Sequence, residues 1–127
     1  KELQKNLHET NRVYVSWPSK DSLSPSPHAT GGAVDVWLYH NGKPADLGIP
    51  FDWMEPEAGT FYQLKFLRKR FENDRIVFKN RTMLIFSMYD AGFSCYGPEI
   101  WHYNFGNQMH SVVTGETARY SYIEPEK

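Results

Sequence analysis

Four side chains that can bind a metal ion or activate the water bound to it stand in two short segments that are far apart in the chain. The first segment reads Ser-Pro-His-Ala-Thr-Gly-Gly-Ala-Val-Asp and contributes His28 and Asp35, and the second reads Glu-Ile-Trp-His and contributes Glu99 and His102. Two histidines and one carboxylate can supply three zinc ligands and leave a fourth position open for water. If all three ligands bind the same ion, the fold must place the two segments side by side. This requirement limits how the chain can fold.

The spacing of these residues predicts a role for each. We expect His28, Asp35 and His102 to be the zinc ligands. Glu99 stands three residues before His102. It is expected to take a proton from the zinc-bound water, whose pKa falls to about 7. Side chains alternate along a strand, so His28 and Asp35 converge only if the small residues at 30–32 turn the chain back. The pattern predicts a hydrolase with Zn2+ as its cofactor.

Each of these residues also has a plain structural interpretation. His28 can be a surface loop histidine, Asp35 an exposed strand carboxylate and His102 a packed core histidine. If Glu99 were only a surface residue, its spacing from His102 would be a coincidence. The valines on either side of Asp35 are of a type that is usually buried, and a buried carboxylate needs a cationic partner. The order of all four residues favours the metal interpretation.

These segments resemble the signature of the zinc D-alanyl-D-alanine peptidases, Ser-x-His-x-x-Gly-x-Ala-x-Asp followed by Glu-x-x-His. Within that family the similarity is strongest to the D-alanyl-D-alanine dipeptidases of the vancomycin-resistance type, over roughly residues 22 to 106. The supporting segments are Asp46-Leu-Gly-Ile-Pro-Phe51-Asp52, Asn80-Arg81 with Ala91-Gly-Phe93, and Glu99-Ile-Trp-His-Tyr103. The resemblance implies a bacterial enzyme that hydrolyses the small dipeptide D-alanyl-D-alanine in cell-wall peptide metabolism.

The resemblance also implies two substrate-binding residues. Ser26 matches the first serine of the motif and is expected near the terminus of the bound dipeptide. Asp52 matches an aspartate that receives the free amino group of the substrate. A carboxylate suits that role because it binds an ammonium group directly. The alternative for Asp52 is a residue that only shapes a turn.

One functional residue of the family has no counterpart here. The family's oxyanion-stabilising arginine stands in a Tyr-Arg-Pro segment well upstream of the first histidine. Arg12 is too close to His28 and has no following proline. We therefore expect residues 1–127 to be the metal-binding part of a single zinc peptidase domain. The N-terminal segment of the family domain is expected to be missing, and a separate polypeptide is a candidate partner that completes it.

Two other functions stay open at this point. A peptidoglycan D,D-carboxypeptidase or endopeptidase would use the same zinc chemistry on a longer substrate. A non-catalytic zinc domain that binds a partner, as hedgehog signalling domains do, would have no need for a base at Glu99.

Composition argues against several classes of partner. The chain has 127 residues, a net charge of −1 and no block of five like charges, which argues against nucleic acid. No apolar run approaches the roughly 20 residues that a membrane helix needs. The single cysteine, Cys95, cannot form an internal disulfide and fits the cytoplasm and the periplasm equally well.

The hydrophobic patterns predict an α+β fold, an antiparallel sheet backed by helices, and the resemblance implies the hedgehog and D,D-peptidase type. A helix is expected over Arg75–Tyr89, capped by Asn73 or Asp74 and ended by Gly92. Strands are expected over the ranges Ala33–Tyr39, Phe93–Tyr96, Ile100–Phe105 and Tyr120–Ile123, with a tight turn at Asn41-Gly42. A helix tail at residues 1–10 and a solvated basic run at Arg68-Lys69-Arg70 are also expected, as are solvated side chains at His8, His40 and His110.

Overall fold

A computed structural model of the chain describes residues 19 and 21 and the ranges 23–64 and 72–123. The predictions for residues 1–10, for the basic run at 68–70 and for His8 lie outside these residues. The described elements are η1 (Pro27–Thr30), β1 (Ala33–Asp35), β2 (Tyr39–His40), β3 (Lys43–Pro44), η2 (Pro56–Ala58), α2 (Glu72–Asp90), β4 (Ser94–Cys95), β5 (His102–Asn104) and α3 (Gln108–Thr114), where η denotes a 3₁₀-helix. The fold therefore combines antiparallel strands with helices, as predicted.

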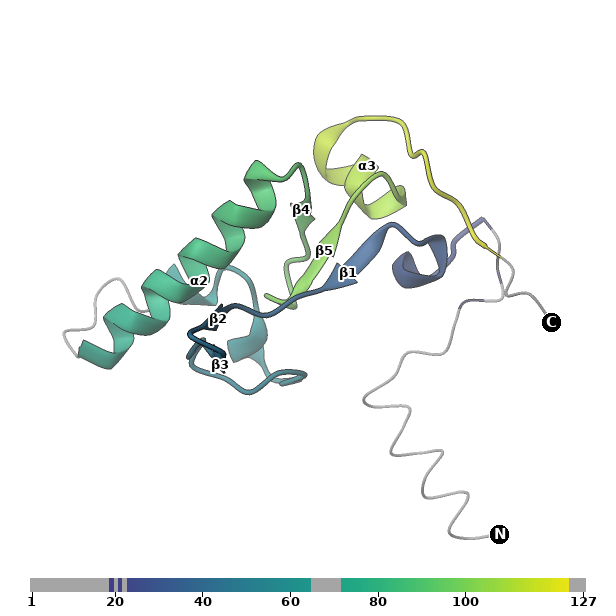
Figure 1. The fold of residues 1–127 in the computed structure, drawn as a ribbon. Helices are drawn as coiled ribbons and strands as arrows, with labels where there is room; N and C mark the ends of the chain where they lie inside the picture. Colours follow the sequence, from purple (N-terminus) through teal and green to yellow (C-terminus); the bar gives the residue numbers. More distant parts are fainter. Residues whose placement is uncertain (1–18, 20, 22, 65–71, 124–127) are drawn as a thin grey trace, which may run out of the picture.

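The central element is β5, the middle strand of a three-stranded antiparallel sheet in the order β1-β5-β4. Its register places Asp35 of β1 opposite His102, and Ser94 of β4 opposite Asn104. Figure 1 shows this sheet between the long helix α2 on one side and η1 on the other. The two strands predicted around residues 93–105 are confirmed, each shorter than expected. The register itself brings two of the predicted metal ligands together.

The single strand expected over Ala33–Tyr39 is wrong, because the chain leaves the sheet after β1. One further backbone hydrogen bond, from Val36 N–H to the Trp101 carbonyl (2.9 Å), follows the last ladder pair. β5 begins only at His102, so the residues after Val36 do not pair with it, and Tyr39 instead starts β2, which pairs with β3. β1 is an edge strand, and Val34 is 37% exposed, so the burial expected around Asp35 is also wrong.

The hairpin predicted at Asn41-Gly42 is confirmed. β2 and β3 pair antiparallel on either side of it. Asn41 and Gly42 have φ values of 50° and 75°, as a two-residue type I′ turn requires at both positions. Asparagine and glycine tolerate this conformation best, so the local sequence alone determines the turn.

Helix α2 is longer than expected at its start. Asn73 and Asp74 lie inside it, so the prediction that either residue caps it is wrong. Acidic side chains are favourable in a first turn because they face the positive end of the helix dipole, so the earlier start has a physical reason. The predicted end is confirmed: Gly92 has a φ of 88° and its N–H donates to the Tyr89 carbonyl over 2.8 Å.

The core lies between α2, the loop before it and β5. Its buried members are Leu47, Ala58, Leu84, Ile100, Trp101 and Tyr103. Several apolar residues of the α2 stripe, including Phe86 at 60% exposure, stay outside this core. Trp101 and Tyr103 flank His102 along β5, so burial of these two rings fixes the strand that carries the second histidine.

The C-terminal part of the described chain differs from prediction. No strand forms at Tyr120–Ile123; that segment is irregular and is held by backbone hydrogen bonds, such as Ile123 N–H to the Ala29 carbonyl (3.0 Å). Helix α3 was not expected. Its boundaries carry standard signals, because Asn107 caps its start and Gly115 ends it with a φ of 77°. No helix in the described ranges is both long and apolar enough to cross a lipid bilayer.

Candidate metal centre

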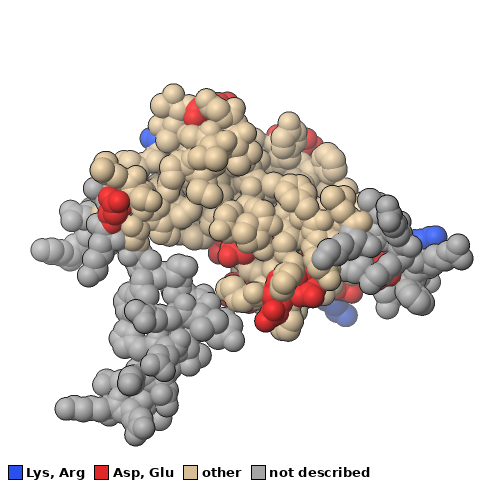
Figure 2. Space-filling view, turned by 180° about the vertical axis from the view of Figure 1, so that it is seen from behind, with Lys and Arg blue, Asp and Glu red and all other residues tan. Residues whose placement is uncertain are grey.

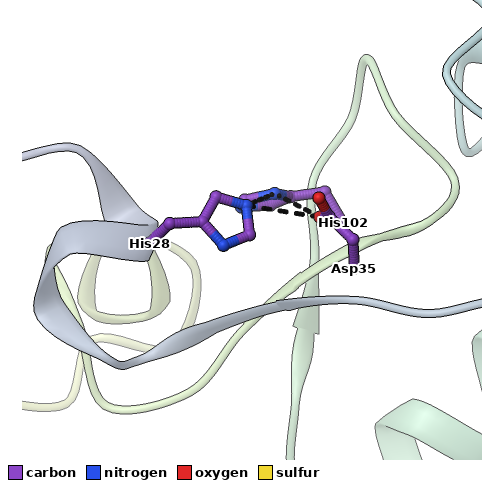
Figure 3. Close-up of side chains that lie close together, drawn as sticks. All are labelled: His28, Asp35 and His102. Carbon is purple, nitrogen blue, oxygen red and sulfur yellow. Dashed lines mark hydrogen bonds and ion pairs between the residues drawn. The ribbon is translucent and has the colours of Figure 1, made fainter. Parts of the chain in front are cut away.

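Three of the predicted site residues converge on one point. Nδ1 of His102 lies 3.0 Å from Oδ1 of Asp35 and 3.1 Å from Nε2 of His28, and the last two atoms are 3.3 Å apart. Figure 3 shows His28 reaching from η1 toward the other two side chains, which come from β1 and β5. The donor atoms of residues from two distant segments thus form a compact triangle.

The triangle has the dimensions of one face of a zinc coordination tetrahedron. Zinc–nitrogen and zinc–oxygen bonds are about 2.0–2.2 Å long, which places neighbouring ligand atoms about 3.3 Å apart. The observed separations of 3.0–3.3 Å are close to this spacing. The side chain of His102 is 8% exposed, whereas those of His28 and Asp35 are 48% and 35% exposed. The donor set therefore fits a divalent metal ion, with open space for water or substrate on the exposed side.

The turn between His28 and Asp35 is built by small residues. Thr30 ends η1 with its hydroxyl on the Pro27 carbonyl (2.6 Å) and accepts a hydrogen bond from Gly32 N–H (3.0 Å). Gly31 has a φ of 69°, which glycine adopts at low cost. A Cβ atom on Gly32 would lie 2.7 Å from the Phe105 carbonyl oxygen, so the chain passes β5 too closely for any side chain. The turn expected at residues 30–32 is present.

Glu99 is close enough to the triangle to interact electrostatically with all three of its side chains. Its side chain is half-buried, just before Ile100 and the start of β5. Burial raises the pKa of Glu99 above its usual value, His102 and His28 lower it, and Asp35 and Asp52 raise it. Every other predicted metal or amine ligand thus acts electrostatically on this one carboxyl group. A raised pKa suits a group that must both accept and return a proton.

The two predicted substrate residues lie on loops. Ser26 immediately precedes η1, and its hydroxyl makes no hydrogen bond that caps this helix. Asp52 is exposed and has a φ of 60°, so it does shape a turn, and its charge also reaches Glu99. Neither residue belongs to the triangle of ligand atoms.

The loop that carries Asp52 is anchored from beneath by Arg81. This arginine is 1% exposed and donates to the backbone carbonyls of Leu47, Glu57 and Gly59 over 2.7, 2.6 and 3.1 Å. Its neighbour Asn80 donates to the Asp46 carbonyl over 2.8 Å. The Asn-Arg pair on α2 therefore determines the path of the chain on both sides of Asp52.

A pocket of about 550 Å³ begins at the metal centre. Asp35, Trp37 and Tyr39 line it at two-residue spacing, and Ile49 and Phe51 line it from the loop that carries Asp52. Trp37 and Phe51 meet edge to face with ring centroids 5.5 Å apart. The spacing of Asp35, Trp37 and Tyr39 could have indicated this pocket from the sequence, since residues two apart share a face of an extended chain.

One expected surface residue is buried instead. His110 is 6% exposed, and its Nδ1 lies 3.1 Å from both the Ser94 hydroxyl and the Asn104 carbonyl, so the prediction of a solvated side chain is wrong. His110 lies on α3, a helix that the sequence pattern did not predict. His40 is exposed as expected.

The charge distribution agrees with the balanced composition. On the described part of the face in Figure 2, uncharged residues dominate, acidic groups are scattered and basic side chains are isolated.

Comparison with known proteins agrees with the resemblance seen in the motifs. A family model described as D-ala-D-ala dipeptidase, an M15 peptidase model, matches residues 2–121. The chain is 32% identical over 117 residues to a D-alanyl-D-alanine dipeptidase from Synechocystis sp., an alignment that covers 85% of this chain and 45% of that protein. The chain thus spans about half the length of the curated relative that it matches. By its match over nearly all of its length, the chain belongs to the D-ala-D-ala dipeptidase family of M15 peptidases.

Proposed function

We propose that this chain carries the zinc centre of an enzyme that hydrolyses D-alanyl-D-alanine. The supporting observation is the convergence of His28, Asp35 and His102 to within 3.3 Å of one another. The assignment also draws on the family and on the dipeptidase relative from Synechocystis sp.. In this proposal residues 1–127 form one zinc peptidase domain, or its metal-binding part, with a fold of the hedgehog and D,D-peptidase type.

The roles of the chain's own residues follow from their positions. His28, Asp35 and His102 would hold the ion, which when bound would lower the pKa of a water molecule and polarise the peptide carbonyl. Glu99 accepts a proton as the water attacks and returns that proton to the nitrogen of the leaving amine.

Substrate orientation is assigned to the loop residues and the pocket. Asp52 binds the free ammonium group of the dipeptide, and its exposure leaves it accessible to a ligand. Ser26, two residues before His28, contacts the far end of the dipeptide. The aromatic wall formed by Trp37 and Phe51 excludes water from one side of the scissile bond.

A substrate comparison tests the proposal. The zinc-loaded protein is assayed on D-alanyl-D-alanine and on an N-acylated tripeptide that ends in D-alanyl-D-alanine, before and after removal of the metal by a chelator. We expect cleavage of the free dipeptide, loss of cleavage without zinc, and recovery when zinc returns. Preferential cleavage of the acylated tripeptide would assign a carboxypeptidase instead. Zinc binding without any hydrolysis, even with the upstream segment of the family domain supplied as a second polypeptide, would assign a binding domain.

Replacement of Glu99 by glutamine distinguishes a role as general base from a role as metal ligand. Glu99→Gln keeps the shape of the side chain but cannot accept the proton, so turnover is expected to fall about a hundredfold or more. Zinc content should stay equal to that of the unchanged protein. Loss of zinc with full activity per bound ion would show that Glu99 is a ligand and that the mechanism is wrong.

A further inference from the structure

The ring of His102 contacts a buried pair of asparagines on its other side. Nε2 of His102, the nitrogen that does not face Asp35, lies 3.3 Å from Oδ1 of Asn104. The same Oδ1 accepts a hydrogen bond of 2.8 Å from Nδ2 of Asn107. Asn104 and Asn107 are 1% and 0% exposed, so their polar atoms depend on these protein partners.

Two backbone groups determine the orientation of the Asn107 amide. Its Oδ1 accepts a hydrogen bond from His110 N–H, and its Nδ2 donates to the Gly32 carbonyl, both over 2.9 Å. A backbone N–H can only donate and a carbonyl can only accept. A flipped amide would lose both bonds, so the second hydrogen of Nδ2 must point toward Asn104.

This orientation continues to the histidine. Because Asn107 offers an N–H, Asn104 must present Oδ1 to it, and this same oxygen faces Nε2 of His102. The asparagine pair thus favours the neutral tautomer with hydrogen on Nε2 and the lone pair on Nδ1, whereas the Asp35 carboxylate, 3.0 Å from Nδ1, favours hydrogen on Nδ1 as long as no ion takes its place. Nδ1 is the atom that faces Asp35 and His28.

We propose that Asn104 and Asn107 are positioning residues that fix the tautomer of His102, so that Nδ1 is ready to bind the ion. A neutral histidine binds a metal through the nitrogen without hydrogen, and the partner of its other nitrogen selects which one that is. The inference rests on the metal role of His102 in the proposed function. Asn107 also ties β5 to the turn at Gly32, so one side chain links both segments that carry ligands.

Two variants of equal charge and opposite hydrogen-bond polarity test this. Asn104→Asp keeps an acceptor toward both Asn107 and His102. Asn107→Asp keeps the acceptor for His110 N–H but replaces the donor Nδ2 by oxygen. Asn104 must then turn its amide nitrogen toward position 107 and so presents N–H to His102, which moves the ring hydrogen to Nδ1.

We expect zinc affinity, measured by competition with a chelator, to fall about 10- to 100-fold in Asn107→Asp and to stay equal or rise in Asn104→Asp. Each variant adds one carboxylate near the ion, so an effect of charge alone would change both affinities in the same direction. In metal-free protein that carries Asp35→Ala, which removes the carboxylate that would accept hydrogen from Nδ1, long-range ¹H–¹⁵N correlation spectra of the neutral ring should show hydrogen on Nε2 of His102. The same tautomer is expected in Asn104→Asp, and the other in Asn107→Asp.

Retention of the Nε2 hydrogen in Asn107→Asp, or affinity changes of the same sign in both aspartate variants, would overturn the proposal. Should Asn107→Asp fail to fold, Asn104→Leu removes the acceptor and keeps the branched shape of the side chain. It should give mixed tautomers and weaker zinc binding, and an unchanged tautomer and affinity would count against the proposal. Neither measurement uses peptide hydrolysis, so a wrong substrate assignment leaves this test intact.

Discussion

The metal centre and the loop that carries Asp52 are built on different principles. Two of the three donor atoms of the metal centre are positioned by strand register, since Asp35 pairs directly with His102, and the turn after η1 brings His28 to them. Asp52 stands in an exposed turn whose course depends on one buried cation, Arg81, and its three carbonyl partners. The difference implies that metal binding and substrate recognition can be damaged separately. Strand pairing should tolerate distant changes, whereas a loop held mainly by one neighbouring pair of side chains, Asn80 and Arg81, should not.

The largest expected effect is loss of the ion. Replacing His28 or His102 by alanine leaves two protein ligands, too few for a stable zinc site. Zinc content measured by elemental analysis should fall from about one equivalent to nearly none in either variant. As a control, His40→Ala removes an exposed histidine outside the centre and should keep the full equivalent. An unchanged zinc content in both variants would contradict the assignment of His28 and His102 as ligands.

Removal of the loop anchor should mainly change stability. Arg81→Met leaves three buried carbonyls without their donor, and charge-assisted hydrogen bonds contribute about 1.5–3 kcal/mol each. We expect the free energy of unfolding to fall by about 3 kcal/mol or more in denaturant titration. Zinc affinity under native conditions should change much less than in the histidine variants. Equal damage to both properties would contradict the separation of the two regions.

A smaller effect is expected at Asp52 itself. Asp52→Ala removes the partner of the substrate ammonium group, so kcat/KM for a dipeptide with a free amino group should fall about tenfold or more. Activity on an N-acylated analogue should change little, because that substrate has no ammonium group. Asp46→Ala, on the same loop, serves as a comparison variant for general loop disturbance. Equal losses on both substrates would make Asp52 a purely structural turn residue.

The smallest effect concerns the pH dependence of stability. Burial raises the pKa of Glu99 in the folded, metal-free protein. Its ionised form therefore destabilises the fold, and this cost is absent below the ordinary glutamate pKa and grows as pH rises through the folded value. Metal-free Glu99→Gln should be more stable than the unchanged protein at neutral pH, with the difference vanishing in acid. A constant difference at all pH values would argue against this origin.

Motif spacing predicted the candidate ligands and the turn at residues 30–32, but not the strand pairing that brings the two segments together. The pairing of Asp35 with His102 depends on strand register, which the segments do not encode separately. The burial expected around Asp35 failed because β1 is an edge strand, a property of the whole sheet. Turn chemistry was local and predictable, as at Asn41-Gly42.

Helix α3 shows why part of the fold could not be predicted from the sequence. Its last residues, Val112, Val113 and Thr114, are β-branched and have low helix propensity. The helix depends on its capping signals, Asn107 and Gly115, and on burial of His110. Sequence periodicity therefore gave no sign of the element that holds the Asn107 side chain in place behind the metal centre.

X-ray absorption spectroscopy of the zinc-loaded protein tests the central claim most directly. Two imidazole nitrogens, one carboxylate oxygen and one water should give about four light-atom neighbours at 2.0–2.1 Å, with outer-shell scattering from two imidazole rings. The His102→Ala variant should lose one of these rings along with most of its zinc. A sulfur neighbour at about 2.3 Å, which would implicate Cys95, or scattering from no more than one imidazole in the unchanged protein, would contradict the account.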